Sequence, residues 1–345
     1  MKLDNKEKKI KFSCNNLWKL FGEDSYNFLR NHNFQPIDED FKKANIIPAV
    51  QNANIKILEG EIFVIMGLSG SGKSTLIRCL SRLTNSTFGE IYFENSDLIK
   101  MSSKELINLR RHKMGMVFQN FALLPHMTVL GNVLFPLEIQ GMKKQDMNKK
   151  ALEVLELVGL KGRENYFPKE LSGGQQQRVG IARSLAVDPE VWFLDEPFSA
   201  LDPLIRREMQ NEFLRIQELL HKTIIFITHD FDEAIKLADR IAIMKDGEII
   251  QIGTPEDLVI SPSNSYVKEF TKDIVRSKVL TAKSIMDDNA IDNNIEYKIN
   301  ENTIVDEFSS KIVDNNIKAL VIDSNNQGIG TIDKNKVIKI LMNRI

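Results

Sequence analysis

Glycine, serine and lysine gather in one short stretch of the chain at a spacing that suits a phosphate group. An apolar run, Ile62–Met66, leads directly into the segment Gly67-Leu-Ser-Gly-Ser-Gly-Lys-Ser-Thr75. Glycines let the backbone wrap closely enough for successive N–H groups to point at phosphate oxygens, and a following helix presents its positive N-terminal end to the same charge. Lys73 supplies a cation for the β- and γ-phosphates, and Ser74 a hydroxyl for Mg²⁺. The stretch predicts a nucleotide site.

The residues on either side of this segment support that prediction. The five residues before it have the length and composition of a buried strand, and after it Leu76, Ile77, Leu80 and Leu83 recur at helical spacing. A strand, a phosphate loop and then a helix is the order that the mechanism requires. A glycine-rich turn in an unrelated α/β domain is the alternative, and this context disfavours it.

Two further apolar runs end in side chains that can bind a metal or move a proton. Val191–Leu194 is followed by Asp195 and Glu196, and Thr223–Thr228 is followed by His229. Ligands of open α/β sheets bind at the carboxyl ends of the strands, so we expect these groups beside the phosphate loop. Two adjacent acids most often lie in a solvated turn, and a lone histidine is most often structural. Here the buried strands and the phosphate loop favour roles near phosphate for Asp195, Glu196 and His229.

A second helix start and one glutamine complete the polar candidates. The segment Leu171-Ser-Gly-Gly-Gln-Gln-Gln-Arg178 precedes an amphipathic run, and Ser172 is a natural N-cap, so this helix end also suits an anion. Ordinary capping is the alternative. Gln119 ends an apolar strand that begins at Met114, a place where a glutamine is usually a surface amide; its role depends on the other groups.

The composition disfavours some classes of function. The chain has 345 residues, enough for about two domains, and its 46 basic and 47 acidic residues give a net charge of −1. Such a balance argues against a protein that coats nucleic acid. Cys14 and Cys79 lie too far apart for metal or redox spacing, so we expect reduced, packed thiols of a cytosolic protein. No apolar run approaches the ~20 residues of a membrane span, and the N-terminus carries no secretion signal, so any membrane role depends on partner chains.

The N-terminal half contains further predicted elements. Residues 9–22 form an opening strand and turn, in which Phe21 either stacks on an adenine ring or fills the core, with the pattern slightly favouring the core. Residues 23–45 are a polar insertion whose form the sequence does not fix, and residues 49–58 alternate as a strand. From 102 to about 160 the periodicity is helical, which predicts a mostly helical insert.

The composition shifts towards Asn, Asp, Ile and Lys beyond residue 270, so we place a domain boundary near 272–277. Before it, short strands at 240–245 and 249–252 flank an Asp246-Gly247 hairpin turn. The tail after it carries no cluster of catalytic residue types. Its pattern predicts a small unit with a helical stripe around 305–312, strands at 319–323 and 329–332, and a closing helix at 334–341.

These motifs resemble the ATP-binding subunits of ABC transporters, and more closely those of the glycine betaine/L-proline importers. The match covers about residues 10–270, with the motifs in the expected order. The closer resemblance rests on three stretches, with support from the leader at 16–22 and the insertion after it. These stretches are 63–75, 121–128 and 201–206.

The resemblance implies an α/β fold of the P-loop NTPase class, the ABC ATPase cassette. Such a cassette has a RecA-like core, a helical subdomain, here about 102–180, and an antiparallel β subdomain. We therefore expect an ATPase nucleotide-binding domain over 1–272, with the insertion at about 23–45. Residues 277–345 resemble a single CBS motif, a small α+β unit.

The resemblance also implies roles for individual residues. Phe21 looks like the adenine-stacking aromatic, and Asp195 like the residue that supports Mg²⁺ through water, while Ser74 and Gln119 would coordinate the ion. Glu196 looks like the general base that orients the attacking water, and His229 would contact the γ-phosphate. The ATP-binding segment comprises Gly67, Leu68, Ser69, Gly70, Ser71, Gly72, Lys73, Ser74 and Thr75.

In such proteins two copies clamp two ATP molecules between them. The signature residues Ser172, Gly173, Gly174 and Gln175 then belong to the opposite protomer's site, and Asp202 lies in the D-loop. Two helix N-termini, one from each chain, would neutralise the triphosphate from both sides, and hydrolysis would remove that attraction.

Two departures from the family pattern concern different parts of the chain. Pro197 follows the glutamate where betaine-type relatives often carry alanine, which weakens the closer resemblance but not the chemistry. Many relatives carry a pair of CBS motifs, and one copy cannot form the usual two-motif module. Two roles of the tail therefore stay open. It could regulate the ATPase in response to ionic strength or adenine nucleotides, or it could be a dimer-stabilising or vestigial unit.

The leading hypothesis is an ATP-hydrolysing subunit of an importer for glycine betaine or proline-type osmolytes. It would work as a homodimer docked on a transmembrane permease, at the cytoplasmic, inner face of the cell membrane, with a separate solute-binding protein choosing the cargo. An importer subunit for another small polar solute is an alternative. A soluble ABC-class ATPase acting on nucleic acid or ribosomes is disfavoured, because the chain has one cassette and no sustained heptads. Intact Glu196 and His229 also argue against a pure ATP sensor.

Overall fold

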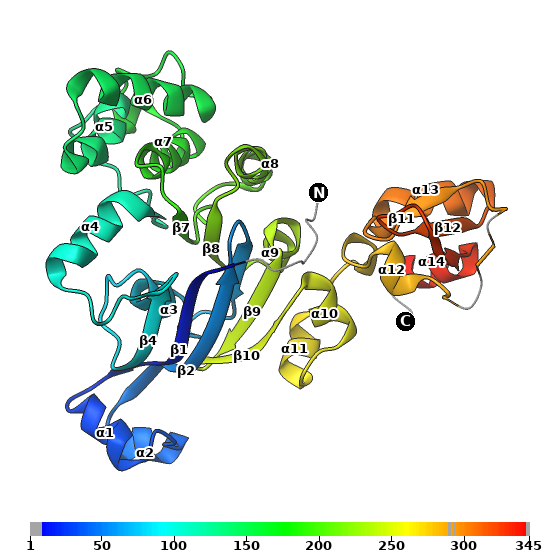
Figure 1. The fold of residues 1–345 in the computed structure, drawn as a ribbon, viewed down its shortest axis with the longest axis horizontal. Helices are drawn as coiled ribbons and strands as arrows, with labels where there is room; N and C mark the ends of the chain where they lie inside the picture. Colours follow the sequence, from blue (N-terminus) through cyan, green and yellow to red (C-terminus); the bar gives the residue numbers. More distant parts are fainter. Residues whose placement is uncertain (1–8, 289–290, 293, 343–345) are drawn as a thin grey trace. The chain divides into compact units, whose positions relative to one another are not determined.

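A computed structural model describes residues 9–288, 291–292 and 294–342. The chain separates into two compact units, residues 7–252 and the part from Gly253 onward, which are treated one at a time (Figure 1). In the described part of the chain, no helix is both long and apolar enough to cross a membrane.

A six-stranded sheet forms the centre of the first unit. Its strands are β3 (Ile62–Met66), β6 (Met114–Val117), β7 (Val191–Asp195), β8 (Thr223–Thr228), β9 (Arg240–Lys245) and β10 (Glu248–Gly253). The order is β10-β9-β3-β8-β7-β6, and every pair from β9 to β6 is parallel. All residues of β3, β7 and β8 are buried, as expected for parallel strands covered on both faces. The three apolar runs predicted as buried strands are thus confirmed.

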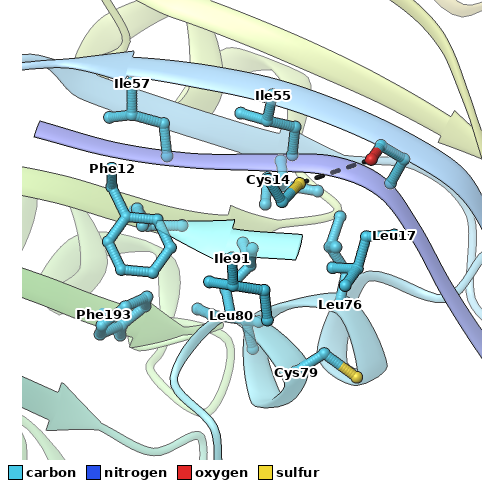
Figure 2. Close-up of a cluster of buried hydrophobic side chains, with 14 of the residues drawn as sticks. Phe12, Cys14, Leu17, Ile55, Ile57, Leu76, Cys79, Leu80, Ile91 and Phe193 are labelled. Atoms are coloured by element: carbon cyan, nitrogen blue, oxygen red, sulfur yellow. Dashed lines mark hydrogen bonds between the residues drawn. The ribbon is translucent and has the colours of Figure 1, made fainter. Parts of the chain in front are cut away.

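A four-stranded antiparallel sheet packs beside this centre. Its strands are β1 (Ile10–Phe21), β2 (Ile47–Leu58), β4 (Phe88–Phe93) and β5 (Ser96–Asp97), in the order β2-β1-β4-β5. Helix α3 (Lys73–Leu80) lies against it, and Figure 2 shows its Leu76 and Leu80 pointing at Ile91 and the β1 side chains. Cys14 and Cys79 are fully buried in this cluster, so the predicted packing of both thiols is confirmed.

The predicted helical insert is also confirmed. Helix α5 packs against α6 and α7. Strand β6 lies between α4 and α5 in the chain and belongs to the six-stranded sheet. The elements are α4 (Ser103–Lys113), α5 (Val129–Gln140), α6 (Lys144–Leu157), a 3-10 turn (Pro168–Glu170) and α7 (Gly173–Ala186). Along the chain, helix α8 (Pro203–Leu220) comes before β8 and helix α9 (Phe231–Leu237) comes after it.

The polar insertion at 23–45 forms two short helices, α1 (Ser25–Asn31) and α2 (Asp38–Lys43). The fully buried Leu29 and the nearly buried Phe41 pack with Trp18 of β1 in a small hydrophobic cluster of their own. Sparse apolar residues in a polar segment gave no periodic signal, which is why the sequence left this form open.

The second unit has a core of its own. Its elements are α10 (Pro255–Ile260), α11 (Ser265–Phe270), a 3-10 turn (Arg276–Lys278), α12 (Ala282–Ile285), β11 (Lys298–Asn300), α13 (Val305–Asn315), β12 (Ala319–Ile322), β13 (Gly328–Ile332) and α14 (Lys334–Leu341). Strand β11 pairs parallel with β12, and β12 antiparallel with β13. The predicted order of helix, two strands and helix is confirmed.

The division between the compact units lies about twenty residues before the shift in composition at 272–277. Within the second unit, the Glu256 carboxylate accepts hydrogen bonds from the backbone and hydroxyl of Thr281, and Val259 packs against the hydrophobic core. Helix α10 therefore groups with the tail by contact, although its composition does not differ from that of the first unit.

Candidate active site

The phosphate loop joins β3 to α3 through backbone conformations that need glycine. Gly70 and Gly72 have φ of +82° and +99°, and Gly67 has φ of +156°. Space is limiting as well, since a Cβ on Gly72 would lie 2.1 Å from the carbonyl oxygen of Ala49, and one on Gly67 would lie 2.3 Å from that of Met244. The loop is thus held between the start of β2 and the end of β9.

Lys73 is folded back over this loop. Its Nζ donates to the carbonyl oxygens of Gly67 at 2.8 Å and Leu68 at 3.0 Å, and the residue is only 5% exposed. Burial lowers the pKa of Lys73, and the nearby Glu196 and Asp195 carboxylates counteract part of that effect. A buried cation whose hydrogen bonds go to neutral carbonyls is suited to meeting an anion at the loop.

Other groups of the loop fit a phosphate. The hydroxyl of Ser71 is buried and has no hydrogen-bond partner in the described structure. The first N–H groups of α3, from Lys73 to Thr75, have no intrahelical acceptors and carry the positive end of the helix dipole. Orphan donors around a buried lysine match the oxygens of a nucleotide triphosphate. Ser69 and Leu68 complete the exposed rim of the loop.

Ser74 and Asp195 form the part of the site that fits Mg²⁺. The Ser74 hydroxyl donates to Asp195 Oδ1 at 3.1 Å, and burial raises the pKa of Asp195 while this bond opposes the rise. Among the described residues no group of three or more His, Cys, Asp and Glu side chains could hold a metal by itself. Mg²⁺ usually binds through one or two protein oxygens together with substrate phosphates and water, so this sparse set fits that ion.

Gln119, Glu196 and His229 meet at the carboxyl edge of the sheet. The Glu196 carboxylate oxygen Oε2 lies 3.0 Å from His229 Nδ1 and accepts from Gln119 Nε2 at 3.3 Å. The structure thus brings together three residues that are far apart in the sequence. The arrangement holds one carboxylate between an imidazole and an amide.

The backbone of Glu196 has a left-handed conformation, with φ of +46°. For a residue other than glycine this costs about 1–2 kcal/mol, so other contacts must hold it. Its N–H donates to the Ile227 carbonyl at 3.1 Å, and its own carbonyl accepts from the Ser199 hydroxyl at 3.0 Å. The Glu196 carboxylate contacts Gln119 and His229, whereas the Asp195 carboxylate accepts from Ser74.

Phe21 is exposed at the end of β1. Its exposed fraction of 46% excludes the core position that the sequence pattern slightly favoured. Its cross-strand partner is Ile47, and Ala49, two residues further along β2, has its carbonyl against Gly72. Lys19 Nζ lies 4.8 Å from the ring centroid of Phe21. The aromatic ring is therefore open to solvent at the end of β1, whose partner strand β2 borders the phosphate loop.

The signature residues lie at the start of α7. The backbone N–H of Gln175 donates to the Ser172 hydroxyl at 3.4 Å, and that of Ser172 donates to the Gln175 side chain at 3.0 Å. A Cβ on Gly174 would lie 2.6 Å from Ile205, and one on Gly173 would lie 3.6 Å from Leu201. Asp202 caps α8 by accepting from the Ile205 N–H at 3.1 Å. These cap hydrogen bonds join residues three apart in the sequence, and none of them reaches the phosphate loop.

Sequence reasoning missed two supports of the site. The Ser199 hydroxyl accepts from Gln119 Nε2 at 3.4 Å as well as donating to the Glu196 carbonyl. The N–H of Gly247, in the predicted hairpin turn, donates to the Ser71 carbonyl at 3.1 Å and so braces the phosphate loop. The Asp-Gly pair signalled the turn, but no local pattern indicates what a turn contacts.

Comparison with known proteins identifies the family. A family model described as "ABC transporter" matches residues 50–199. The trimethylamine N-oxide transport system ATP-binding protein TmoW of Pelagibacter ubique is 54% identical over 331 residues, which are 96% of this chain and 97% of that protein. The chain belongs to the ABC transporter family. It is one of the ATP-binding subunits, as the motif order had indicated.

Other ABC proteins agree with this placement. The glycine betaine transport ATP-binding protein OpuAA of Bacillus subtilis is 51% identical over 281 residues, covering 81% of this chain and 67% of that protein. Among solved structures, the dimeric bacterial ABC transporter cassette MJ0796 has a TM-score of 0.60 at 36% identity, covering 71% of this chain and 98% of that chain. The same cassette has been solved in a post-hydrolysis state with ADP and phosphate. The expected ABC ATPase cassette fold is confirmed, and as an ABC ATPase this chain binds ATP with Mg²⁺.

Proposed function

We propose that this chain is the ATP-hydrolysing subunit of an importer for trimethylated amine osmolytes. The observation that carries the proposal is the high identity to subunits named for trimethylamine N-oxide and glycine betaine transport, together with a complete set of ATPase groups around Glu196. A separate solute-binding protein would select the cargo, and the ATPase would power its passage through a permease.

Alignment length favours trimethylamine N-oxide over glycine betaine as the cargo. Relatives named for trimethylamine N-oxide, from Pelagibacter ubique and Ruegeria pomeroyi, align over 96% of this chain and 96–97% of their own lengths. The glycine betaine protein OpuAA aligns over 67% of its length only. The alignments with the first group thus include nearly all of this chain, whereas that with OpuAA covers 81% of it.

The site supports hydrolysis by a water that Glu196 activates. The water would attack the γ-phosphorus, the bond to the β-phosphate would break, and the proton of the water would pass to the Glu196 carboxylate. His229, 3.0 Å from that carboxylate, would hold it and meet the γ-phosphate. Lys73 and the loop N–H groups would bind the phosphates, Phe21 would stack on the adenine, and Ser74, Gln119 and Asp195 would serve Mg²⁺.

The second half of each site would come from a second copy of the chain. Ser172 caps a 14-residue helix whose first turn is exposed around Gly173, and an anion is favoured at such a helix end. The dimeric state of the MJ0796 cassette supports the same arrangement. The residues from Ser172 to Gln175 of one protomer would then face the loop 67–75 of the other, with Asp202 near the contact.

A groove on the first unit suits a permease. It has a volume of about 380 Å³ and lies between the strand before Gln119 and the helical insert. Apolar side chains, among them Phe118, Leu124 and Phe135, line it beside Arg183, and such a mixture fits a short helix of a membrane protein. Docking there would hold the chain at the cytoplasmic face of the cell membrane.

The dimer can be tested with Glu196→Gln. This variant keeps the shape of the side chain but removes the base, so it should bind MgATP normally and accumulate as a dimer on size-exclusion chromatography with light scattering. ADP should leave the same variant monomeric. Lys73→Ala, which removes the phosphate cation, serves as the control that should stay monomeric with either nucleotide. A Glu196→Gln chain that remains monomeric at saturating MgATP contradicts the proposal.

The cargo can be tested in cells whose gene for this chain is disrupted. Uptake of radiolabelled trimethylamine N-oxide should be lost and should return with a plasmid carrying the wild-type chain but not with Glu196→Gln. Glycine betaine uptake measured in parallel distinguishes the two cargoes. Unchanged uptake of both solutes in the disrupted strain contradicts the proposed cargo class, whatever the dimer experiment gives.

A further inference from the structure

Arg206 joins the two loops that carry Glu196 and His229. It is the fourth residue of α8, and its guanidinium Nη2 donates to the carbonyl oxygens of Leu201 at 3.0 Å and Ser199 at 3.4 Å. Both acceptors belong to the loop that follows Glu196. One guanidinium nitrogen therefore holds two backbone positions of that loop.

The other end of the guanidinium holds the loop of His229. Arg206 Nη1 lies 3.5 Å from Asp230 Oδ2, and Asp230 directly follows His229. Asp230 is fixed in turn, because its N–H donates to the Thr228 hydroxyl at 3.0 Å and its Oδ1 accepts from the Glu233 N–H at 3.1 Å. Arg206 thus spans from the loop after β7 to the start of α9.

Both loops position the Glu196 carboxylate. Ser199, whose carbonyl accepts from Arg206, also donates its hydroxyl to the Glu196 carbonyl at 3.0 Å. His229 reaches the carboxylate from the other loop at 3.0 Å. Residues of the two loops, Arg206 and Glu233 line one small cavity behind these groups. The strained left-handed backbone of Glu196 needs such support, since a relaxed loop would lose the turn.

The structure assigns Arg206 as a positioning residue that couples the Glu196 loop to the His229 loop. A guanidinium is suited to this because its planar fork presents several N–H groups in fixed directions, whereas a lysine ammonium is a single point charge. The assignment rests on the proposed catalytic roles of Glu196 and His229. Arg206 itself is 29% exposed at its side chain and would touch neither phosphate nor the attacking water.

The test compares Arg206→Met with Arg207→Met in the full chain. Arg207 is the exposed neighbour on the same helix, so its replacement controls for loss of one positive charge. We expect Arg206→Met to lower the kcat of ATP hydrolysis about tenfold or more, because small displacements of reacting groups can cost a hundredfold. KM and the affinity for a fluorescent ATP analogue should change less than about twofold. Arg207→Met should match the wild type.

A double-mutant cycle distinguishes coupling from a general structural effect. If Arg206 acts through the His229 loop, His229→Ala should lower kcat much less in the Arg206→Met background than in the wild type. Arg206→Lys, which can keep one of the contacts, should restore part of kcat; it also serves if Arg206→Met proves unstable by thermal unfolding. Additive effects, or an increase in KM with unchanged kcat, would overturn the assignment. Unchanged turnover in His229→Ala alone would instead refute the proposed role of His229.

Discussion

Asp195 is a buried carboxylate in the midst of the site. It is 5% exposed and accepts a hydrogen bond from the Ser74 hydroxyl, while Glu196 adds a second negative charge nearby. Burial raises the pKa of Asp195 above its ordinary value. The nearby cations Arg78 and Lys73 offset only part of this effect, so the ionised side chain opposes folding, and bound Mg²⁺ would reduce that penalty.

This electrostatic argument predicts the effect of Asp195→Asn on stability. A carboxyl with a raised folded pKa contributes stability that is fully present below its unfolded pKa, roughly pH 4, and is lost as the pH rises through the folded pKa. In metal-free buffer at pH 7–8 the asparagine variant should therefore unfold at a higher temperature than the wild type. This advantage should shrink towards pH 4.

Thermal unfolding followed by circular dichroism across this pH range measures the difference. Asp232→Asn, at an exposed position in the first turn of α9, is the control for loss of a surface charge. Magnesium and ATP together should reverse the order at pH 7.5, because the wild type keeps the Asp195 carboxylate and so gains more from the ion. A stability difference that does not change with pH would contradict the argument.

At the scale of single elements, the phosphate loop depends on two kinds of glycine. A Cβ on Gly72 would strike the Ala49 carbonyl at 2.1 Å, so both strain and a collision oppose a side chain there. Gly70 has a similar left-handed backbone, with φ of +82°, but nothing lies within 4 Å of its Cβ position. The loop thus contains a matched pair for separating conformation from space.

The pair predicts different outcomes for Gly70→Ala and Gly72→Ala. Gly70→Ala should cost about 1–2 kcal/mol of unfolding free energy, the penalty for a left-handed L-residue, and should retain most ATP binding. Gly72→Ala should cost more and should abolish ATP binding, since β2 must move away from the start of α3. Urea unfolding and a fluorescent nucleotide titration measure both effects. Equal losses in the two variants would show that the contact with Ala49 is unimportant.

Elements whose signals are local could be predicted from the sequence. The buried strands β3, β7 and β8 and helix α3 were expected because long apolar runs and helical spacing are visible along the chain. Gln119, Asp195, Glu196 and His229 were placed at strand ends for the same reason, and parallel strands bring such ends together. The sequence thus indicated which residues meet.

Features that arise from contact between distant segments could not be predicted. The left-handed backbone of Glu196 depends on Ile227 and Ser199, and the burial of Phe41 depends on a cluster that includes Trp18 of β1. The sequence pattern slightly favoured a core position for Phe21, and this was wrong. The exposure of a side chain is set by the neighbouring strand, which residue type alone does not reveal. The division at Gly253 likewise follows from pairs such as Glu256 and Thr281.

The whole molecule consists of two units, each with a hydrophobic core of its own. The core of the second unit is built by α13, α14 and the three-stranded sheet, with Val259 of α10 against it. Ser277 donates to Asp306 at 3.1 Å and so ties the start of the tail to α13. A cut between the units and a cut within the second unit should therefore have different consequences.

Two truncated chains, 1–252 and 1–276, test this organisation. The first removes everything from Gly253 onward, so it should fold, bind MgATP and resist proteolysis as the cassette does in the full chain. The second keeps α10 and α11 but removes the partners of Glu256 and Val259, so residues 253–276 should be cleaved rapidly in limited proteolysis read by mass spectrometry.

ATPase rates of the full chain and of 1–252 across a series of KCl concentrations then separate a regulatory tail, whose loss changes the salt response, from a tail that only adds stability. Failure of 1–252 to fold or to bind MgATP would mean that the two units form one cooperative structure.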